Sequence, residues 1–205
     1  MVAAFIATAV AAILNWYACW KDLPTLESIS KPLTTVGAIV IALLAGGPTD
    51  ATIAGVVALS LCLVGDIALL EVVDRFIVGL AAFLLGHVAF VVMFAMLGFD
   101  RWRTAGFAIA GSALVLGTVA VPIMRGAATK GFGIPVRIYL GVILSMAVLG
   151  WATGNWLIML GTAAFVVSDS ILGWNRFVGG KPWMEVGIMM TYHLAIVSLA
   201  LSLSL

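Results

Sequence analysis

Two aspartates stand out because each lies inside a long apolar segment, Asp66 in the first half of the chain and Asp169 in the second. An ionisable side chain inside a bilayer costs about 2.5–3.5 kcal/mol on insertion scales, so it usually faces a cavity or a partner. Each aspartate is expected about one turn from a helix end, roughly 6 Å inside the boundary. Two carboxyl groups held there can differ in protonation, one serving as acid and the other as base. The alternative is that each only caps a helix or pairs with a nearby arginine.

Two histidines also fall within apolar segments. His87 is predicted near the middle of one helix and His193 in the last helix, beside Tyr192. Either histidine can orient a carboxyl group or a water molecule, or simply be a hydrogen-bonded core residue. No His-x-x-x-His or His-x-x-x-Asp pair lies on one helix face, so we expect no metal ion and no cofactor. The cysteines, Cys19 and Cys62, also lack a metal-type spacing and are interpreted as packing residues.

The composition places these residues in a membrane protein. Of the 205 residues, 64% are hydrophobic and 9% are charged, against roughly 25% charged residues in soluble domains. The length allows a single transmembrane domain, residues 1–205, and leaves no room for a soluble one. The net charge of +1, from ten scattered Lys and Arg, argues against nucleic acid as a partner.

Continuous apolar segments predict an all-α fold with about eight membrane-spanning helices. The expected spans are 2–20, 33–46, 52–70, 75–97, 104–122, 134–152, 155–173 and 183–204. Seven spans with a re-entrant segment is the main alternative, because the second span is short. The segments lack the alternating pattern of a membrane barrel.

The basic residues predict an orientation. One set of loops and helix starts holds Lys21, Lys31, Arg75, Arg125, Lys130, Arg137, Arg176 and Lys181. The opposite side holds only Arg101 and Arg103. By the positive-inside rule, both termini face away from the cytoplasm. The first span has no preceding Lys or Arg, so it is expected to be a retained helix of a multi-pass protein, in the cell membrane if the source is bacterial.

The two halves, 1–100 and 101–205, match weakly at an offset of about 103 residues. Asp66 then aligns with Asp169, and His87 and His193 follow them by 21 and 24 residues. A four-helix repeat keeps its orientation in both copies, so the two aspartates would lie at one depth. Two parallel repeats are therefore a hypothesis. The alternative is that the weak match arises by chance among Leu, Val and Ala.

Polar residues near the predicted basic side suit a lipid headgroup. Lys31 and Arg137 begin their helices there, and Asn175 lies at a similar level. These residues could hold a lipid phosphate, although ordinary membrane anchoring accounts for each of them equally well.

Several motifs together resemble the YhhN-like family of membrane lysoplasmalogenases. The resemblance rests on Gly65-Asp66-Ile67-Ala68-Leu69-Leu70, Phe76, Gly79, Phe83, Gly86 and His87, Phe165-Val166-Val167-Ser168-Asp169, Lys31-Pro32 and Tyr139. It implies a membrane enzyme without a cofactor that hydrolyses the vinyl ether bond of lysoplasmalogens. The products would be a fatty aldehyde and a glycerophospho-alcohol.

The resemblance and the residues together assign expected roles. Asp66, Asp169 and His87 are the expected catalytic residues, and the substrate would be a lysophospholipid taken from the membrane. Substrate contacts are expected from Lys31, Arg137, Tyr139, Ser168, Tyr192 and Asn175. One departure is that Tyr192-His193-Leu194-Ala195-Ile196 stands where the family has a Tyr-Tyr-x-Ala-Gln pattern.

Other functions fit the same residues. A hydrolase of ester or amide lysolipids needs a similar pocket, and a small proton-coupled transporter also uses repeated halves and intramembrane aspartates. A scaffold without activity is a further alternative. The sequence does not determine the headgroup, the oligomeric state or which aspartate is the acid.

Overall fold

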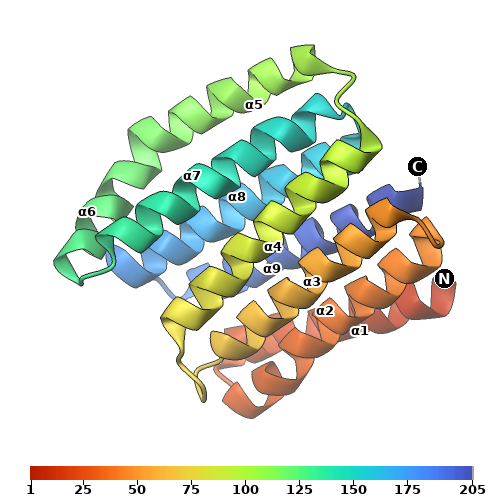
Figure 1. Ribbon diagram of the computed structural model, residues 1–205. Helices are drawn as coiled ribbons and strands as arrows, with labels where there is room; N and C mark the ends of the chain where they lie inside the picture. Colours follow the sequence, from red (N-terminus) through yellow and green to blue (C-terminus); the bar gives the residue numbers. More distant parts are fainter. Residues whose placement is uncertain (205) are drawn as a thin grey trace.

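The structure is a computed structural model that describes residues 1–204, and within them it is helical with no strand (Figure 1). The elements are α1 (Val2–Lys21), α2 (Pro24–Gly46), α3 (Asp50–Ala68), α4 (Phe76–Leu97), α5 (Trp102–Val115), the π-helical turn η1 (Leu116–Ala120), α6 (Val121–Thr129), α7 (Gly133–Ala152), α8 (Trp156–Phe177), α9 (Trp183–Leu201) and η2 (Ser202–Ser204). Eight helices are long and apolar enough to cross a membrane, with α5, η1 and α6 forming one of them. The all-helical, eight-span prediction is confirmed.

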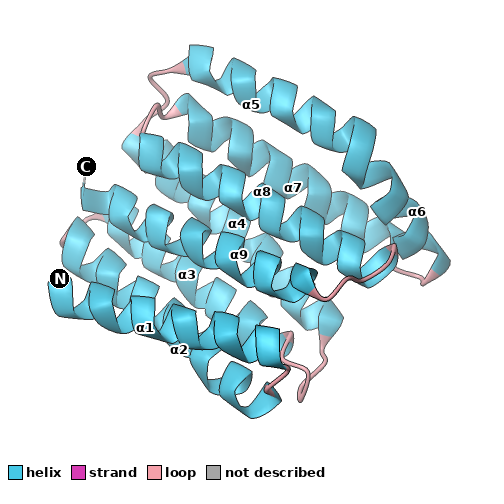
Figure 2. Ribbon diagram, turned by 180° about the vertical axis from the view of Figure 1, so that it is seen from behind, coloured by secondary structure: helices cyan, strands magenta, loops and turns pink. Residues whose placement is uncertain are grey.

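The helices form a bundle in which α1 and α5 lie on opposite outer edges (Figures 1 and 2). Near the centre, α2 packs against α9 and α4 packs against α7. Other neighbours are α1 with α2, α3 with α4, α5 with α7, and α8 with α9. Under the offset of about 103 residues each of these contacts has a counterpart, since the α2–α9 pair corresponds to the α7–α4 pair. The repeat stays a hypothesis, which these matched contacts support.

Three predicted boundaries were wrong, and two of these errors occurred at a proline. The seventh span ends at Phe177, not at residue 173. The second span begins at Pro24, not at residue 33, so Pro32 lies inside α2. The fifth span runs through Pro122 to Thr129, not to residue 122. Proline removes a backbone donor and crowds the preceding turn, and the wider turn η1 lies directly before Pro122. The second span is therefore full length, and the seven-span alternative does not hold.

Close helix contacts fix the segments that carry the aspartates. A Cβ atom on Gly65 would lie 2.5 Å from the Phe83 ring, so only glycine allows α3 to approach α4 this closely. A Cβ atom on Gly161 would lie 2.8 Å from Leu199, so a glycine also allows the close approach of α8 to α9. Asp66 follows Gly65 directly, so this packing determines where its side chain points.

Candidate active site

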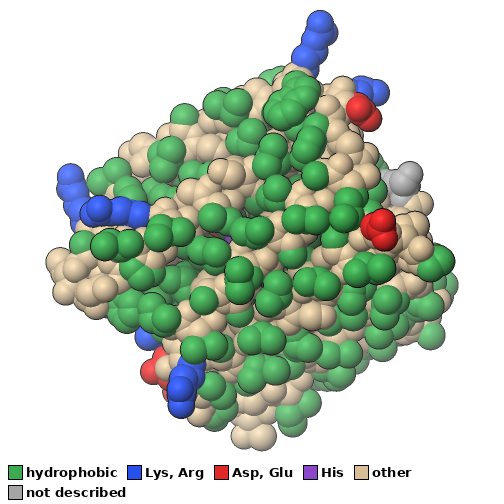
Figure 3. All heavy atoms as spheres, in the orientation of Figure 1, with side chains coloured by type: hydrophobic (Ala, Val, Ile, Leu, Met, Phe, Trp, Pro, Cys, Tyr) green, Lys and Arg blue, Asp and Glu red, His purple; other side chains and the backbone are tan. Residues whose placement is uncertain are grey.

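Asp66 and Asp169 line the same cleft, which opens at one end of the bundle. Its mouth includes Asp22 from the α1–α2 connection, Asp74 from the α3–α4 connection and Lys130 from the α6–α7 connection. Figure 3 shows the charged side chains gathered toward the ends of the helices, with apolar side chains covering the surface between them. The cleft therefore leads from the polar end of the molecule into its apolar interior.

The two aspartates differ in depth along their helices. Asp66 lies close to the end of α3 at Ala68, whereas α8 continues past Asp169 to Phe177. The expectation of one turn from the helix end is therefore wrong for Asp169, which lies roughly 12 Å from that end at 1.5 Å per residue. Asp66 is nevertheless the more buried, with no exposure, against 16% for the Asp169 side chain.

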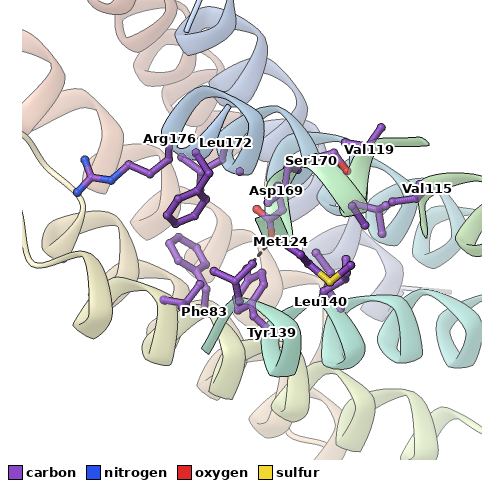
Figure 4. A pocket seen from close by; sticks show the side chains of 18 of the residues that line it. Phe83, Val115, Val119, Met124, Tyr139, Leu140, Asp169, Ser170, Leu172 and Arg176 are labelled. Atoms are coloured by element: carbon purple, nitrogen blue, oxygen red, sulfur yellow. Dashed lines mark hydrogen bonds between the residues drawn. The ribbon is translucent and has the colours of Figure 1, made fainter. Parts of the chain in front are cut away.

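Asp169 is held by side chains from two neighbouring helices. The Tyr139 hydroxyl on α7 donates to Asp169 Oδ2 at 2.5 Å (Figure 4). His87 Nε2 on α4 lies 2.9 Å from the Tyr139 hydroxyl and 3.5 Å from Asp169 Oδ2. His87 is fully buried, with its ring edge-on to Phe165.

The hydrogen bonds around Asp169 have a definite direction. A tyrosine hydroxyl has one proton, and Tyr139 donates it to Asp169, so His87 Nε2 must donate to the Tyr139 oxygen. His87 Nδ1 is buried without a hydrogen-bond partner, which suits the neutral imidazole with its proton on Nε2. The chain of donors therefore runs from His87 through Tyr139 to Asp169.

Asp66 is held in a comparable way. The Thr35 hydroxyl on α2 donates to Asp66 Oδ2 at 2.5 Å, and the Tyr192 hydroxyl on α9 donates to the same oxygen at 2.7 Å. Asp66 Oδ1 has no hydrogen-bond partner among the described residues. Lys31 lies one turn before Thr35 on α2, is 5% exposed, and lines the same cleft. Two hydroxyl donors thus contact one carboxylate oxygen, and a lysine lines the same cleft.

The surroundings of the two aspartates correspond across the halves of the chain. The separation along the sequence is 103 residues between Asp66 and Asp169, 104 between Thr35 and Tyr139, and 105 between His87 and Tyr192. Each carboxyl group accepts a hydrogen bond from a hydroxyl of its own half of the chain, which lies on α2 for Asp66 and on α7 for Asp169. Each also has a polar neighbour from the other half, which lies on α9 for Asp66 and on α4 for Asp169. The counterpart of His87 is thus Tyr192, and the predicted pairing with His193 was wrong.

An apolar chamber adjoins the polar cleft at Asp169. It is bounded by α4, the α5–η1–α6 helix, α7 and α8. Leu69, Phe83, Asp169, Leu172 and Arg176 line both the chamber and the cleft. In Figure 4, Asp169 and Tyr139 point toward one another among apolar side chains. A carboxyl group therefore stands where an apolar compartment meets a polar one.

The remaining predicted residues fall into three places. Ser168 and Asn175 line the cleft, and the Ser168 hydroxyl donates to the Ile188 carbonyl at 3.1 Å. Arg137 is exposed and lines a separate groove between α5 and α7. His193 Nδ1 accepts from Trp16 Nε1 at 3.0 Å, in the contact of α9 with α1. The structure thus brings Lys31, Tyr139, Ser168, Asn175 and Tyr192 together with the aspartates, but not Arg137 or His193.

Sequence reasoning missed Thr35, which supplies the shortest contact to Asp66. Thr35 lies four residues after Lys31, so both residues are on one face of α2, and this spacing could have identified Thr35 from the sequence. Within residues 1–204, no three His, Cys, Asp or Glu side chains are grouped as metal ligands.

Comparison with known proteins identifies the family. The model of the YhhN family matches residues 26–203. Searches of the curated proteins and of the solved structures returned no match. The family match covers most of the chain and includes both aspartates and all of their hydrogen-bond partners. The chain belongs to the YhhN family.

Proposed function

We propose that this protein is a membrane hydrolase that cleaves the vinyl ether bond of lysoplasmalogens. Membership of the YhhN family supports a membrane protein of this kind. The observation that carries the proposal is the position of Asp169, between an apolar chamber and a polar cleft. In a lysoplasmalogen, the vinyl ether joins the hydrocarbon chain to the glycerol, so it lies at the same kind of boundary.

The substrate would be bound in two parts. The chamber takes the alkenyl chain, since its lining is almost entirely apolar. The cleft takes the glycerol and the phosphate headgroup, with Lys31, Lys130 and Arg176 as the cations near the phosphate. Asn175 and Ser168 lie on the same wall of the cleft. This placement brings the vinyl ether beside Asp169.

Hydrolysis then needs one acid and one base. Asp169, as a neutral acid, donates a proton to the alkene carbon that is not bonded to oxygen, producing an oxocarbenium ion. Asp66, as a carboxylate, takes a proton from the water that adds to the cation, giving a hemiacetal. The hemiacetal collapses to the aldehyde and the alcohol as Asp169 takes the hydroxyl proton and Asp66 gives its proton to the leaving oxygen, so both aspartates are regenerated and the net change is addition of one water. Glycosidases likewise use two carboxyl groups, one as acid and one as base or nucleophile, to pass through an oxocarbenium-like transition state.

The hydrogen bonds support this division of roles. Two hydroxyl donors and the nearby Lys31 stabilise negative charge on Asp66. Asp169 has a single donor on Oδ2 and is the aspartate that borders the chamber. Tyr139 and His87 are positioning residues, because they contact Asp169 and not the expected place of the reacting carbon.

The test compares three lysolipids with one headgroup and one chain length but a vinyl ether, an ester or a saturated ether bond. Purified protein should release fatty aldehyde from the vinyl ether alone, and the saturated ether should act as a competitive inhibitor. Cleavage of the ester without the vinyl ether would refute the proposal and favour an esterase. Solute flux in proteoliposomes with all three lipids intact would favour a transporter.

A further inference from the structure

A groove runs along the surface between the neighbouring helices α5 and α7. Its lining comprises Ile109, Ser112, Ala113, Leu116, Met124, Arg137, Leu140, Gly141, Leu144, Ser145, Val148 and Leu149. Arg137 is the one charged residue of this lining, and it lies toward the end of α7 where the catalytic cleft opens. A Cβ atom on Gly141 would meet nothing within 4 Å, so the groove is open there. An apolar slot with a cation at one end matches a lipid chain joined to a phosphate.

A second arginine lies at the same level. Arg125 on α6 and Arg137 on α7 are each six residues from Gly131, in the connection of two antiparallel helices that pack together. Both are exposed, and neither has a salt-bridge partner among residues 1–204. Guanidinium groups bind phosphate oxygens in pairs of parallel hydrogen bonds. Arg137 therefore offers unpaired positive charge at the edge of the apolar groove, and Arg125 follows Met124 of the groove lining directly in sequence.

Only a thin wall separates the groove from the chamber beside Asp169. Met124, Leu140 and Leu144 line both spaces, so their side chains form this wall. A hydrocarbon chain in the groove lies one side chain away from the proposed substrate chamber. Methionine and leucine side chains change rotamer readily, and methionine adapts well to differently shaped apolar ligands.

The helix that bounds this wall is the least embedded of the eight. Only 11% of an 18-residue apolar window of the Trp102–Thr129 span is buried inside the protein, against 33–56% for the corresponding windows of the other spans. The π-helical turn η1 interrupts it beside the chamber, where Val115, Val119 and Ala120 line the chamber. A π-helical turn relaxes the regular hydrogen bonding of a helix and often occurs at functional sites. The α5 and η1 part of this helix therefore loses less packing on moving than the other spans would, whereas α6 is held against α8 at Gly126.

We propose that the groove between α5 and α7 is a lateral access site for a single-chain lysophospholipid. The phosphate binds Arg137 and Arg125, the chain lies along the groove, and displacement of the Met124–Leu140–Leu144 wall admits the chain to the chamber. This inference rests on the proposed function, since it assigns a route to the same substrate. It also gives Arg137 a role outside the catalytic cleft.

Kinetics in lipid nanodiscs test the route. Arg137→Gln should raise KM about tenfold for a long-chain vinyl ether lysolipid in the bilayer, because a charge-assisted contact to the phosphate is lost. Its kcat should not change, since Arg137 does not line the cleft. KM for a short-chain, water-soluble vinyl ether should also stay constant, since this substrate reaches the cleft from water. Arg103→Gln removes an exposed arginine at the opposite end of α5 and is the matched control.

Blocking the groove gives a second kinetic test. Gly141→Leu adds a side chain in the groove without a clash, and it should also raise KM for the bilayer substrate alone. Gly106→Leu, at an equally open glycine of α5 outside the groove, is its control. Unchanged KM values in both Arg137→Gln and Gly141→Leu, or equal changes for the two substrates, would overturn the proposal.

Photolabelling tests the site without any need for hydrolysis. A saturated ether lysophosphatidylethanolamine with a diazirine at the chain end should label residues 109–116 and 141–149 in nanodiscs, and Gly141→Leu should reduce this labelling. A diacyl phospholipid with the same diazirine should label them much less. Equal labelling by the two lipids would assign the groove to ordinary bilayer lipid and overturn the proposal. If no lysolipid were hydrolysed but the groove were selectively labelled, the proposed reaction would fail and the binding site would stand.

Discussion

Replacing Tyr139 with phenylalanine removes one oxygen atom and the only hydrogen bond that Asp169 accepts within residues 1–204. A hydrogen bond to a charged group contributes about 1.5–3 kcal/mol, and each 1.36 kcal/mol of barrier changes a rate about tenfold. When Asp169 gives its proton to the alkene it becomes a carboxylate, and the Tyr139 hydroxyl then stabilises it most. We therefore expect kcat for aldehyde release to fall about 10- to 150-fold in Tyr139→Phe, with KM changed little.

The same substitution leaves the packing intact, since the phenylalanine ring keeps its edge-on contact with His87 at 5.4 Å between centroids. His87 Nε2 loses its 2.9 Å partner, so the unfolding free energy should drop by about 1–3 kcal/mol, which thermal unfolding in detergent would measure. Tyr17→Phe is the matched control, because Tyr17 is 47% exposed and lies outside both the cleft and the chamber.

A double mutant distinguishes a positioning role from a merely structural one. His87→Gln should lower kcat in the native background and have little further effect in Tyr139→Phe, because His87 acts on Asp169 through Tyr139. Additive losses from the two substitutions would refute the donor chain. Full activity in a folded Tyr139→Phe protein would refute the role of Asp169 as the proton donor.

Further predictions concern the acids, the chamber and the fold. Asp66→Asn and Asp169→Asn should each lower aldehyde release by about a thousandfold or more with unfolding temperatures retained, as measured by gas chromatography and by scanning fluorimetry. Ser170→Phe places a ring in the chamber and should shift the kcat/KM optimum toward shorter alkenyl chains. Gly126→Ala puts a methyl group against the α8 backbone and should destabilise the protein by about 1–3 kcal/mol, whereas Gly117→Ala, which meets nothing, should not.

The membrane fold was predictable because each span is a continuous apolar segment. Two boundary errors came from treating proline as a helix boundary, and a third placed the end of α8 four residues too early. Pro32 and Pro122 both lie in continuous spans, and the turn η1 before Pro122 cannot be read from composition. The orientation of the termini remains a prediction, because it depends on charge at the membrane surface and not on helix packing.

The two aspartates were predictable from the free-energy cost of placing an ionisable side chain inside a bilayer, because such a side chain usually faces a cavity or a partner. The hydrogen-bond partners of these aspartates were not predictable from the sequence. Tyr192 contacts Asp66 while the next residue, His193, faces Trp16, because successive side chains on a helix point about 100° apart. Only the packing of α9 against α1 and α2 determines which of the two residues faces the cleft.

The central claim is that a carboxyl group protonates the alkene of a vinyl ether, and hydrolysis in D₂O tests it most directly. Protonation of the carbon next to the future carbonyl places one deuterium there, on a C–H position that exchanges slowly. We predict that mass spectrometry of the released fatty aldehyde will show a gain of one deuterium at carbon 2, and that Asp169→Asn will abolish its formation. Aldehyde without deuterium at carbon 2, or no aldehyde from a folded protein in a bilayer, would contradict the proposed mechanism.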